Sequence, residues 1–175
     1  LKEMNEPDAE EITLKGIESR LNARYKLENG KEIGFYGLAD KLEEVDGVTR
    51  VVDYKTGNTK KKDLELDADF EEQFDSGKKG NAIQLLVYCA MLLKDSKEEF
   101  VSAGIRSGRN SKAGLLSLVI DGEDKITKES VTKLLQWIQH RLETLGEEGR
   151  ELEHNHDSNF CEYCVVLDPK KNFWD

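Results

Sequence analysis

The segment LADKLEEVDGVTRVVDYK, residues 38–55, decides the fold of this chain. Its centre is Asp46-Gly47. The runs on either side of this dipeptide, residues 38–45 and 48–55, each contain the apolar residues expected of a strand. Asp-Gly is a strong two-residue hairpin signal because both positions tolerate positive φ. If these residues form the turn, Val45 pairs with Val48 and every further pair follows by counting outward. The segment therefore predicts two antiparallel strands in a defined register.

That register places Asp40 directly opposite Asp53, with Lys55 on the same face as Asp53. Like charges directly opposite one another destabilise a sheet, so the pair needs an explanation. A divalent-metal site provides one, because Mg²⁺ binds through one or two carboxylates together with substrate phosphate oxygens. The lysine would orient water or offset charge in the transition state. The alternative is a solvated strand face on which these residues and Lys41 are surface charges, and spacing alone slightly favours it.

The rest of the chain extends these two strands into a mixed sheet. Residues 1–17 are acidic and unpatterned, and we interpret them as a lead-in or the end of a preceding helix. Alternation from Ser19 predicts a first strand, and Asn29-Gly30 predicts a hairpin into a second strand at 32–43, followed by a third at 48–54. Leu21, Ala23, Tyr25 and Leu27 share one face of the first strand.

The second half of the chain adds helices and further strands. The polar segment 57–80 predicts a long loop, and such loops are often functional. Residues 81–93 are apolar on nearly every side, which indicates a buried helix. Two strands at 100–106 and 114–120 precede an amphipathic helix that Gly146 closes. The order three strands, helix, two strands, helix predicts a single α/β domain, with 147–175 as an acidic tail.

The amino-acid composition excludes several classes of protein. The chain has 175 residues, a formal net charge of −10 and 35% charged residues. It excludes collagen and a disulfide scaffold, and its longest apolar run, residues 85–93, is too short for a membrane span. Three cysteines and no signal-like start favour a cytoplasmic protein, and a start at Leu1 suggests a piece of a longer one. The acidity argues against a general polyanion-binding protein, but it gathers at the two ends of the chain, while lysine clusters flank the proposed site.

Three sequence blocks occur in a fixed order: GLADK at 37–41, VVDYKTG at 51–57 and QLLVY at 84–88. Together they resemble the nuclease domain of the RecB/AddB type, a branch of the PD-(D/E)XK nuclease superfamily. The family pattern is G-x-x-D-[RK], an apolar strand ending in D-Y-K-T-G, and a helix carrying Q-L-x-x-Y. The resemblance covers roughly residues 20–120 and implies a restriction-endonuclease-like fold.

The resemblance implies roles for individual residues. Asp40 and Asp53 would be metal ligands, the Tyr54 carbonyl would complete the protein ligands, and Lys55 would be the catalytic lysine. The implied reaction is Mg²⁺- or Mn²⁺-dependent hydrolysis of DNA phosphodiesters by in-line attack of water. The implied context is an exonuclease module of a DNA repair or recombination helicase–nuclease, with DNA and further domains or a helicase subunit as partners. A catalytically inactive DNA-binding or assembly module is the alternative.

Gln84 and Tyr88 lie one helical turn apart and share a face. In the family this face supports the active site and the nucleic-acid strand; alternatively, the two side chains satisfy one another in a buried helix. Basic residues flanking the site are candidate phosphate contacts, although solvated loops explain them as well. Phe70 and Phe74 could stack on bases or anchor their loop to the core. The basic candidates are Lys60, Lys61, Lys62, Lys78, Lys79, Arg106, Arg109 and Lys112.

Two departures from the family pattern concern metals. The family usually has a further His or Glu ligand upstream, for which Glu10, Glu11 and Glu18 are available, none of them assignable. Some relatives carry an iron–sulfur cluster held by four cysteines. Here Cys161 and Cys164 form C-x-x-C, but Lys170 stands at the next cysteine position, so we expect no such cluster.

The tail offers one further metal hypothesis. His154, His156, Cys161 and Cys164 are four zinc-competent ligands, which would suit a small zinc-binding interaction domain. The four-residue spacing between the second histidine and the first cysteine leaves little room to wrap an ion, so we favour a degenerate family tail. Cys89 lies in the apolar helix and reads as a small buried side chain.

Overall fold

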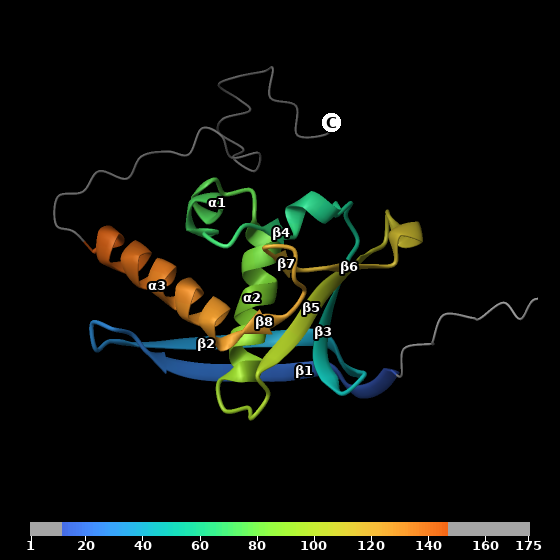
Figure 1. Cartoon of the computed structure of the whole chain (residues 1–175), viewed down its shortest axis with the longest axis horizontal. Coiled ribbons are helices and arrows are strands. Elements are labelled where there is room, and N and C mark those ends of the chain that lie inside the picture. Colours follow the sequence, from blue (N-terminus) through green and yellow to red (C-terminus); the bar gives the residue numbers. More distant parts are fainter. Residues whose placement is uncertain (1–11, 147–175) are drawn as a thin grey trace, which may run out of the picture.

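The computed structural model describes residues 12–146, and these form one twisted sheet with helices packed on it (Figure 1). The sheet order is β1-β2-β3-β5-β6, and a short β8 also pairs with β5. β3 and β5 run parallel, whereas β1–β2, β2–β3 and β5–β6 are antiparallel. This is the predicted mixed α/β fold. The strands of the sheet are β1 (Ile12–Lys26), β2 (Glu32–Val45), β3 (Val48–Lys55), β5 (Phe100–Ser107), β6 (Leu115–Ser117) and β8 (Ile126–Thr127).

The Asp46-Gly47 turn forms as expected. Asp46 has φ of 50° and Gly47 has φ of 81°, and Val45 pairs with Val48. Two consecutive positive φ values match the twist of a hairpin, which explains why this dipeptide stands there. The register of β2 and β3 is therefore the one that the sequence predicts.

The first hairpin forms with a different turn. The Leu27 amide donates to the Lys31 carbonyl at 2.8 Å, which closes a three-residue loop rather than a two-residue turn. Only Gly30 of that loop is left-handed, with φ of 83°. A three-residue loop places a single glycine in this conformation, so Asn29 does not need positive φ.

The interpretation of residues 12–17 as a lead-in or helix end is wrong. β1 begins at Ile12 and pairs with the end of β2, with an irregularity between Leu14 and Gly16. Its apolar side chains are exposed there, Ile17 at 67%. Residues 12–15 alternate apolar and polar side chains, but the irregularity between Leu14 and Gly16 interrupts this short pattern before the clear alternation that begins at Ser19.

The segment predicted as a long loop contains short elements. They bury Leu64, Leu66, Phe70 and Phe74, all at 3% exposure or less. Leu66 belongs to β4, which pairs in parallel with β7. The single strand predicted at 114–120 is therefore two strands, β6 and β7. The elements of this segment are η1 (Lys61–Asp63), β4 (Glu65–Leu66) and α1 (Glu71–Asp75), and the later chain adds η2 (Ser111–Ala113) and β7 (Val119–Ile120).

The core lies between the sheet and two helices, α2 (Gly80–Leu93) and α3 (Lys128–Leu145). α2 crosses the sheet and buries eight of its residues, as its apolar sequence predicts. Cys89 is among them, and burial raises the pKa of its thiol, so it behaves as a small apolar residue. Thr127 caps α3 by accepting a hydrogen bond from the Ser130 amide at 3.3 Å. None of the helices in the described range is long and apolar enough to cross a membrane.

Glu43 is a buried charge in the antiparallel part of the sheet, at 1% exposure. It contacts the Lys41 ammonium and accepts a hydrogen bond from Arg50 Nε at 2.7 Å. Burial works to raise the pKa of Glu43, but the hydrogen bonds and charges of Lys41 and Arg50 outweigh it, so the pKa lies below its ordinary value. This triad fixes β2 to β3 directly beside the candidate site.

Candidate active site

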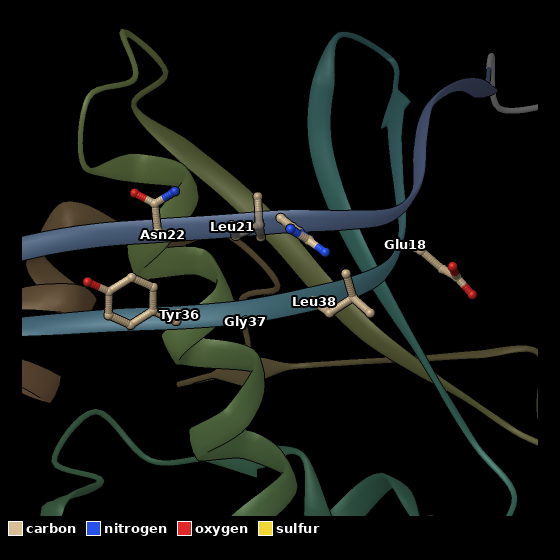
Figure 2. A pocket seen from close by; sticks show the side chains of 7 residues that line it. Glu18, Leu21, Asn22, Tyr36, Gly37 and Leu38 are labelled. Atoms are coloured by element: carbon tan, nitrogen blue, oxygen red, sulfur yellow. The ribbon is translucent and has the colours of Figure 1, made fainter.

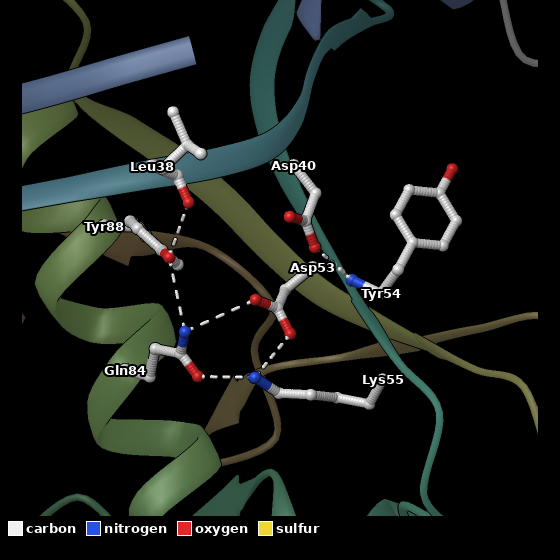
Figure 3. Close-up of polar contacts among 7 residues, drawn as sticks. All are labelled: Leu38, Asp40, Asp53, Tyr54, Lys55, Gln84 and Tyr88. Carbon is white, nitrogen blue, oxygen red and sulfur yellow. Dashed lines mark hydrogen bonds and ion pairs between the residues drawn. The ribbon is translucent and has the colours of Figure 1, made fainter. Parts of the chain in front are cut away.

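The candidate site lies where β2 and β3 separate, a place that we call the β2–β3 fork. The last ladder pair between them is Lys41 with Val52, so Asp40 and Asp53 are the next residues in register. Here Asp40 Oδ2 accepts a hydrogen bond from the Tyr54 amide at 2.8 Å (Figure 3). The carboxylate thereby takes a backbone donor at the point where the ladder stops.

Asp53 is not on a solvated face, because it is only 5% exposed. Its Oδ2 forms an ion pair with Lys55 Nζ at 2.9 Å, yet that buried oxygen has no hydrogen-bond partner in the described structure. Burial raises the pKa of Asp53 above its ordinary value, Lys55 works against the rise, and the charge of Asp40 adds to it. For Asp53 the surface-charge alternative is therefore wrong.

A chain of polar contacts links this carboxylate to α2. Lys55 Nζ donates to Gln84 Oε1 at 2.8 Å, and Gln84 Nε2 donates to Asp53 Oδ1 at 3.4 Å. The same amide nitrogen donates to the Tyr88 hydroxyl at 3.3 Å, which in turn donates to the Leu38 carbonyl at 2.8 Å (Figure 3). Gln84 and Tyr88 thus contact one another, as one of the two sequence interpretations expects, and Gln84 also contacts Asp53 and Lys55.

Gly37 allows α2 to approach this closely. A Cβ on Gly37 would lie 2.8 Å from Tyr88 Cε1 and 3.0 Å from Met91 Cε. Real side-chain carbons do not come so near, so the helix would have to move away from β2. The glycine of the first sequence block is therefore needed for packing, a role that its motif alone does not reveal.

The oxygen donors at the fork fit a small divalent cation. Asp40, Asp53 and the Tyr54 carbonyl are hard oxygen donors, the type that Mg²⁺ and Mn²⁺ prefer. The buried Asp53 Oδ2 without a hydrogen bond is what such an ion would satisfy. Within residues 12–146 there is no group of three or more His, Cys, Asp or Glu side chains that could hold a metal.

Glu18 is the described member of the upstream acidic candidates. Its neighbours Ile17 and Ser19 pair with Lys41 and Ala39, which puts Glu18 beside Asp40 in the register. Its backbone has φ of 48°, unusual for this residue type, and its side chain is exposed. Glu10 and Glu11 lie outside the described residues.

Some of the basic candidates lie beside the site. Arg106 is directly opposite Tyr54 in the parallel β3–β5 register, and both are exposed. The Gly108 amide donates to the Lys55 carbonyl at 2.7 Å, so the loop that carries Arg109 touches the end of β3. Sequence reasoning missed Ser107, whose buried hydroxyl donates to the Gly57 carbonyl at 2.7 Å and ties this loop to the segment after β3.

Other candidates have structural roles. Lys79 Nζ donates to the carbonyls of Lys62 and Glu65, at 2.6 and 2.7 Å. Lys61 is exposed and pairs with Glu65 at 3.2 Å. Lys60, Lys62, Lys78 and Lys112 are exposed, and no contact in the structure assigns them a function.

The two phenylalanines do not face solvent. Phe70 and Phe74 are 1% and 3% exposed, with ring centroids 4.8 Å apart. Phe74 also packs edge-on against Trp137 of α3 at 5.2 Å. The base-stacking hypothesis is therefore wrong for this pair, and the alternative, anchoring of the segment to the core, is confirmed.

The tail candidates lie outside the described residues. They are His154, His156, Cys161 and Cys164, and the structure bears on neither the zinc nor the iron–sulfur expectation.

Comparison with known families gives one match. A model described as the PD-(D/E)XK nuclease superfamily matches residues 2–168, nearly the whole chain. No curated protein matches the chain.

Proposed function

The chain belongs to the PD-(D/E)XK nuclease superfamily, and from this premise we propose that it is a metal-dependent deoxyribonuclease with its active site at the β2–β3 fork. The superfamily consists generally of hydrolytic nucleases that use divalent metals. The observation that carries the proposal is the buried Asp53 carboxylate, which faces Asp40 in register and keeps one oxygen without a hydrogen bond.

On this proposal Asp40, Asp53 and the Tyr54 carbonyl hold Mg²⁺ or Mn²⁺. The bound cation would lower the pKa of a water molecule and offset the charge of the phosphate under attack. The Tyr54 amide holds the Asp40 carboxylate in place by donating a hydrogen bond of 2.8 Å to its Oδ2. The protein thus fixes one ligand through its own backbone before any ion or substrate arrives.

Lys55 is the proposed catalytic residue among the side chains that are not metal ligands. An ammonium has three N–H donors. Gln84 Oε1 accepts one of these N–H groups at 2.8 Å, and Asp53 Oδ2 is an ion-pair partner at 2.9 Å, so the ammonium keeps donor capacity for the attacking water or a phosphate oxygen. Its partial exposure, 30% of the side chain, lets substrate reach it. Gln84 acts as a positioning residue, because it contacts Lys55 and Asp53 rather than the reacting atoms, and Tyr88 acts through its contact with Gln84.

A cleavage assay tests the proposal. Labelled single- and double-stranded DNA is incubated with Mg²⁺, Mn²⁺ or EDTA. Asp53→Ala and Lys55→Ala should abolish cleavage while keeping a folded circular dichroism spectrum, whereas the exposed Lys97→Ala should cut like the parent. Cleavage by both site variants at the parent rate would refute the assignment. A folded parent that binds DNA but never cuts it would favour the alternative of an inactive module.

Metal binding can be measured apart from cleavage. Calorimetric titration with Mn²⁺ should show binding to the parent that is lost in Asp40→Ala. Metal bound instead by the histidines and cysteines of the tail would leave the titration of that variant unchanged.

The three sequence blocks support a finer assignment to the RecB/AddB type. We therefore propose that the chain is an exonuclease module of a cytoplasmic DNA repair or recombination assembly that also contains a helicase. An exonuclease degrades linear single-stranded DNA and leaves a covalently closed circle of the same sequence intact. Equal cleavage of both substrates would identify an endonuclease instead.

A further inference from the structure

The β1–β2 hairpin has one face that α2 covers and one that it leaves open. Side chains on the open face alternate with half-buried or buried ones along both strands, so that Arg20, Asn22 and Arg24 of β1 are exposed next to Tyr36 and Leu38 of β2. The cross-strand pairs are Arg20 with Leu38 and Asn22 with Tyr36. Figure 2 shows Asn22 and Tyr36 side by side in front of the strands, with α2 behind them. We call these five residues the hairpin face.

The hairpin face is basic in an acidic protein. The chain carries a formal charge of −10, whereas the outward positions from Arg20 to Lys26 and from Glu32 to Leu38 hold three cations and one carboxylate. Lys26 and Glu32 are directly opposite one another and can offset each other's charge. Arg20 and Arg24 remain, and within the described residues neither forms an ion pair. Two available guanidinium groups on one strand suit a phosphate backbone.

Tyr36 is the most exposed of the large hydrophobic side chains in the described range, at 73%. A Cβ on Gly34 would lie 3.2 Å from Tyr36 Cε2 and 3.6 Å from its hydroxyl oxygen, so the ring leans over the glycine. Because Gly34 has no side chain, the Tyr36 ring has room to lie over it. An aromatic ring held against a strand and open to solvent on its other side is a platform on which a nucleic-acid base can stack.

The hairpin face leads to the candidate site. Leu38 is two residues from Asp40, and Tyr36 is four, which in an extended strand is roughly 13 Å. A shallow pocket lined by Leu38, Tyr36, Arg20 and Asn22 also includes Glu18, the residue beside Asp40 in the register (Figure 2). The pocket therefore extends from the hairpin face to the strand position beside Asp40.

We propose that the hairpin face binds an unpaired segment of the DNA substrate and guides it to the fork. A base stacks on Tyr36, Leu38 adds an apolar contact, and Arg20 and Arg24 contact phosphates. The segment must be unpaired, because bases in a duplex are stacked on one another and present no free face to a tyrosine. This inference rests on the proposed nuclease function, since that function supplies the reason for DNA at the fork.

Binding in EDTA tests the inference without requiring cleavage. Fluorescence anisotropy of the full chain is measured with a labelled oligothymidylate and with a duplex of the same length. The parent should bind the single strand more tightly. Tyr36→Ala should weaken that binding about tenfold, and Tyr36→Phe should retain it, because stacking needs the ring and not the hydroxyl. Replacing Arg20 and Arg24 with alanine should weaken binding and flatten its salt dependence.

Lys97→Ala is the matched control for charge, because Lys97 is exposed in the turn after α2. It should bind like the parent. Tyr36→Ala that binds the single strand as tightly as the parent, or a parent that binds the duplex as well as the single strand, would overturn the inference. Failure of the nuclease proposal gives a different result: Asp53→Ala and Lys55→Ala would still cut DNA, whatever the anisotropy shows.

Discussion

The hydroxyl of Tyr88 connects α2 to β2 and contacts Gln84, the residue that reaches the candidate site, and Tyr88→Phe removes these two hydrogen bonds alone. The side chain is 7% exposed, and its hydroxyl donates to the Leu38 carbonyl at 2.8 Å. Its second contact, the 3.3 Å hydrogen bond from Gln84 Nε2, is longer and weaker. Phenylalanine keeps the ring that packs against Gly37, so the change tests the hydrogen bonds rather than the packing.

The expected loss of stability follows from the two contacts. Removing the donor leaves the Leu38 carbonyl without its partner, which costs about 1.5 kcal/mol of unfolding free energy. For a chain of this size that loss lowers the melting temperature by about 3 to 6 °C. The amide of Gln84 also loses a partner and can rotate, and the Lys55 ammonium that it holds then becomes less well placed. We expect kcat for DNA cleavage to fall about tenfold with little change in KM.

Tyr25→Phe is the matched control. Tyr25 also donates its hydroxyl to a carbonyl of the same helix region, that of Ala90, at 2.7 Å, but it has no contact with Asp53, Lys55 or Gln84. It should lose similar stability and keep the parent kcat. Melting temperatures come from circular dichroism and kcat from Mn²⁺-dependent cleavage of labelled DNA. An unchanged kcat in Tyr88→Phe, or an equal fall in both variants, would refute the reasoning, because then the contact chain does not position Lys55.

Three further predictions concern packing, charge and metal. Gly37→Ala should lower the unfolding free energy by about 1 to 3 kcal/mol in urea titrations, because the new Cβ meets the Tyr88 ring at 2.8 Å; an unchanged midpoint would contradict the close approach. Glu43→Ala should cost about 3 kcal/mol at neutral pH, since Arg50 loses a buried partner. The pKa of Glu43 is lowered on folding, so its contribution is present above about pH 4.5 and fades as pH falls through the folded pKa; the gap between parent and variant should narrow in acid. Saturating Mn²⁺ at about 100 times its dissociation constant should stabilise the parent by about 2.7 kcal/mol and leave Asp40→Ala unaffected, as differential scanning calorimetry would record.

Local sequence was a good guide wherever neighbouring residues decide the structure. The Asp46-Gly47 turn set the β2–β3 register as far as Lys41 and Val52, the pair next to Asp40 and Asp53. It was a poor guide where pairing replaces burial, as in residues 12–17, which form a strand with exposed apolar side chains. It also misjudged Phe70 and Phe74, because a polar stretch with isolated aromatics does not reveal which side chains reach the core.

The sequence by itself therefore determined the mixed α/β order and the β2–β3 register, because turn geometry and strand periodicity depend on residues close together in the chain, while the superfamily followed from the resemblance of three sequence blocks. The tertiary structure decided that Asp53 is buried, that Gln84 bridges Lys55 and Asp53, and that one face of the first hairpin is open. These features join residues some 30 to 50 positions apart. They arise when α2 packs across one face of the sheet at Gly37 and leaves the other face of the hairpin to solvent.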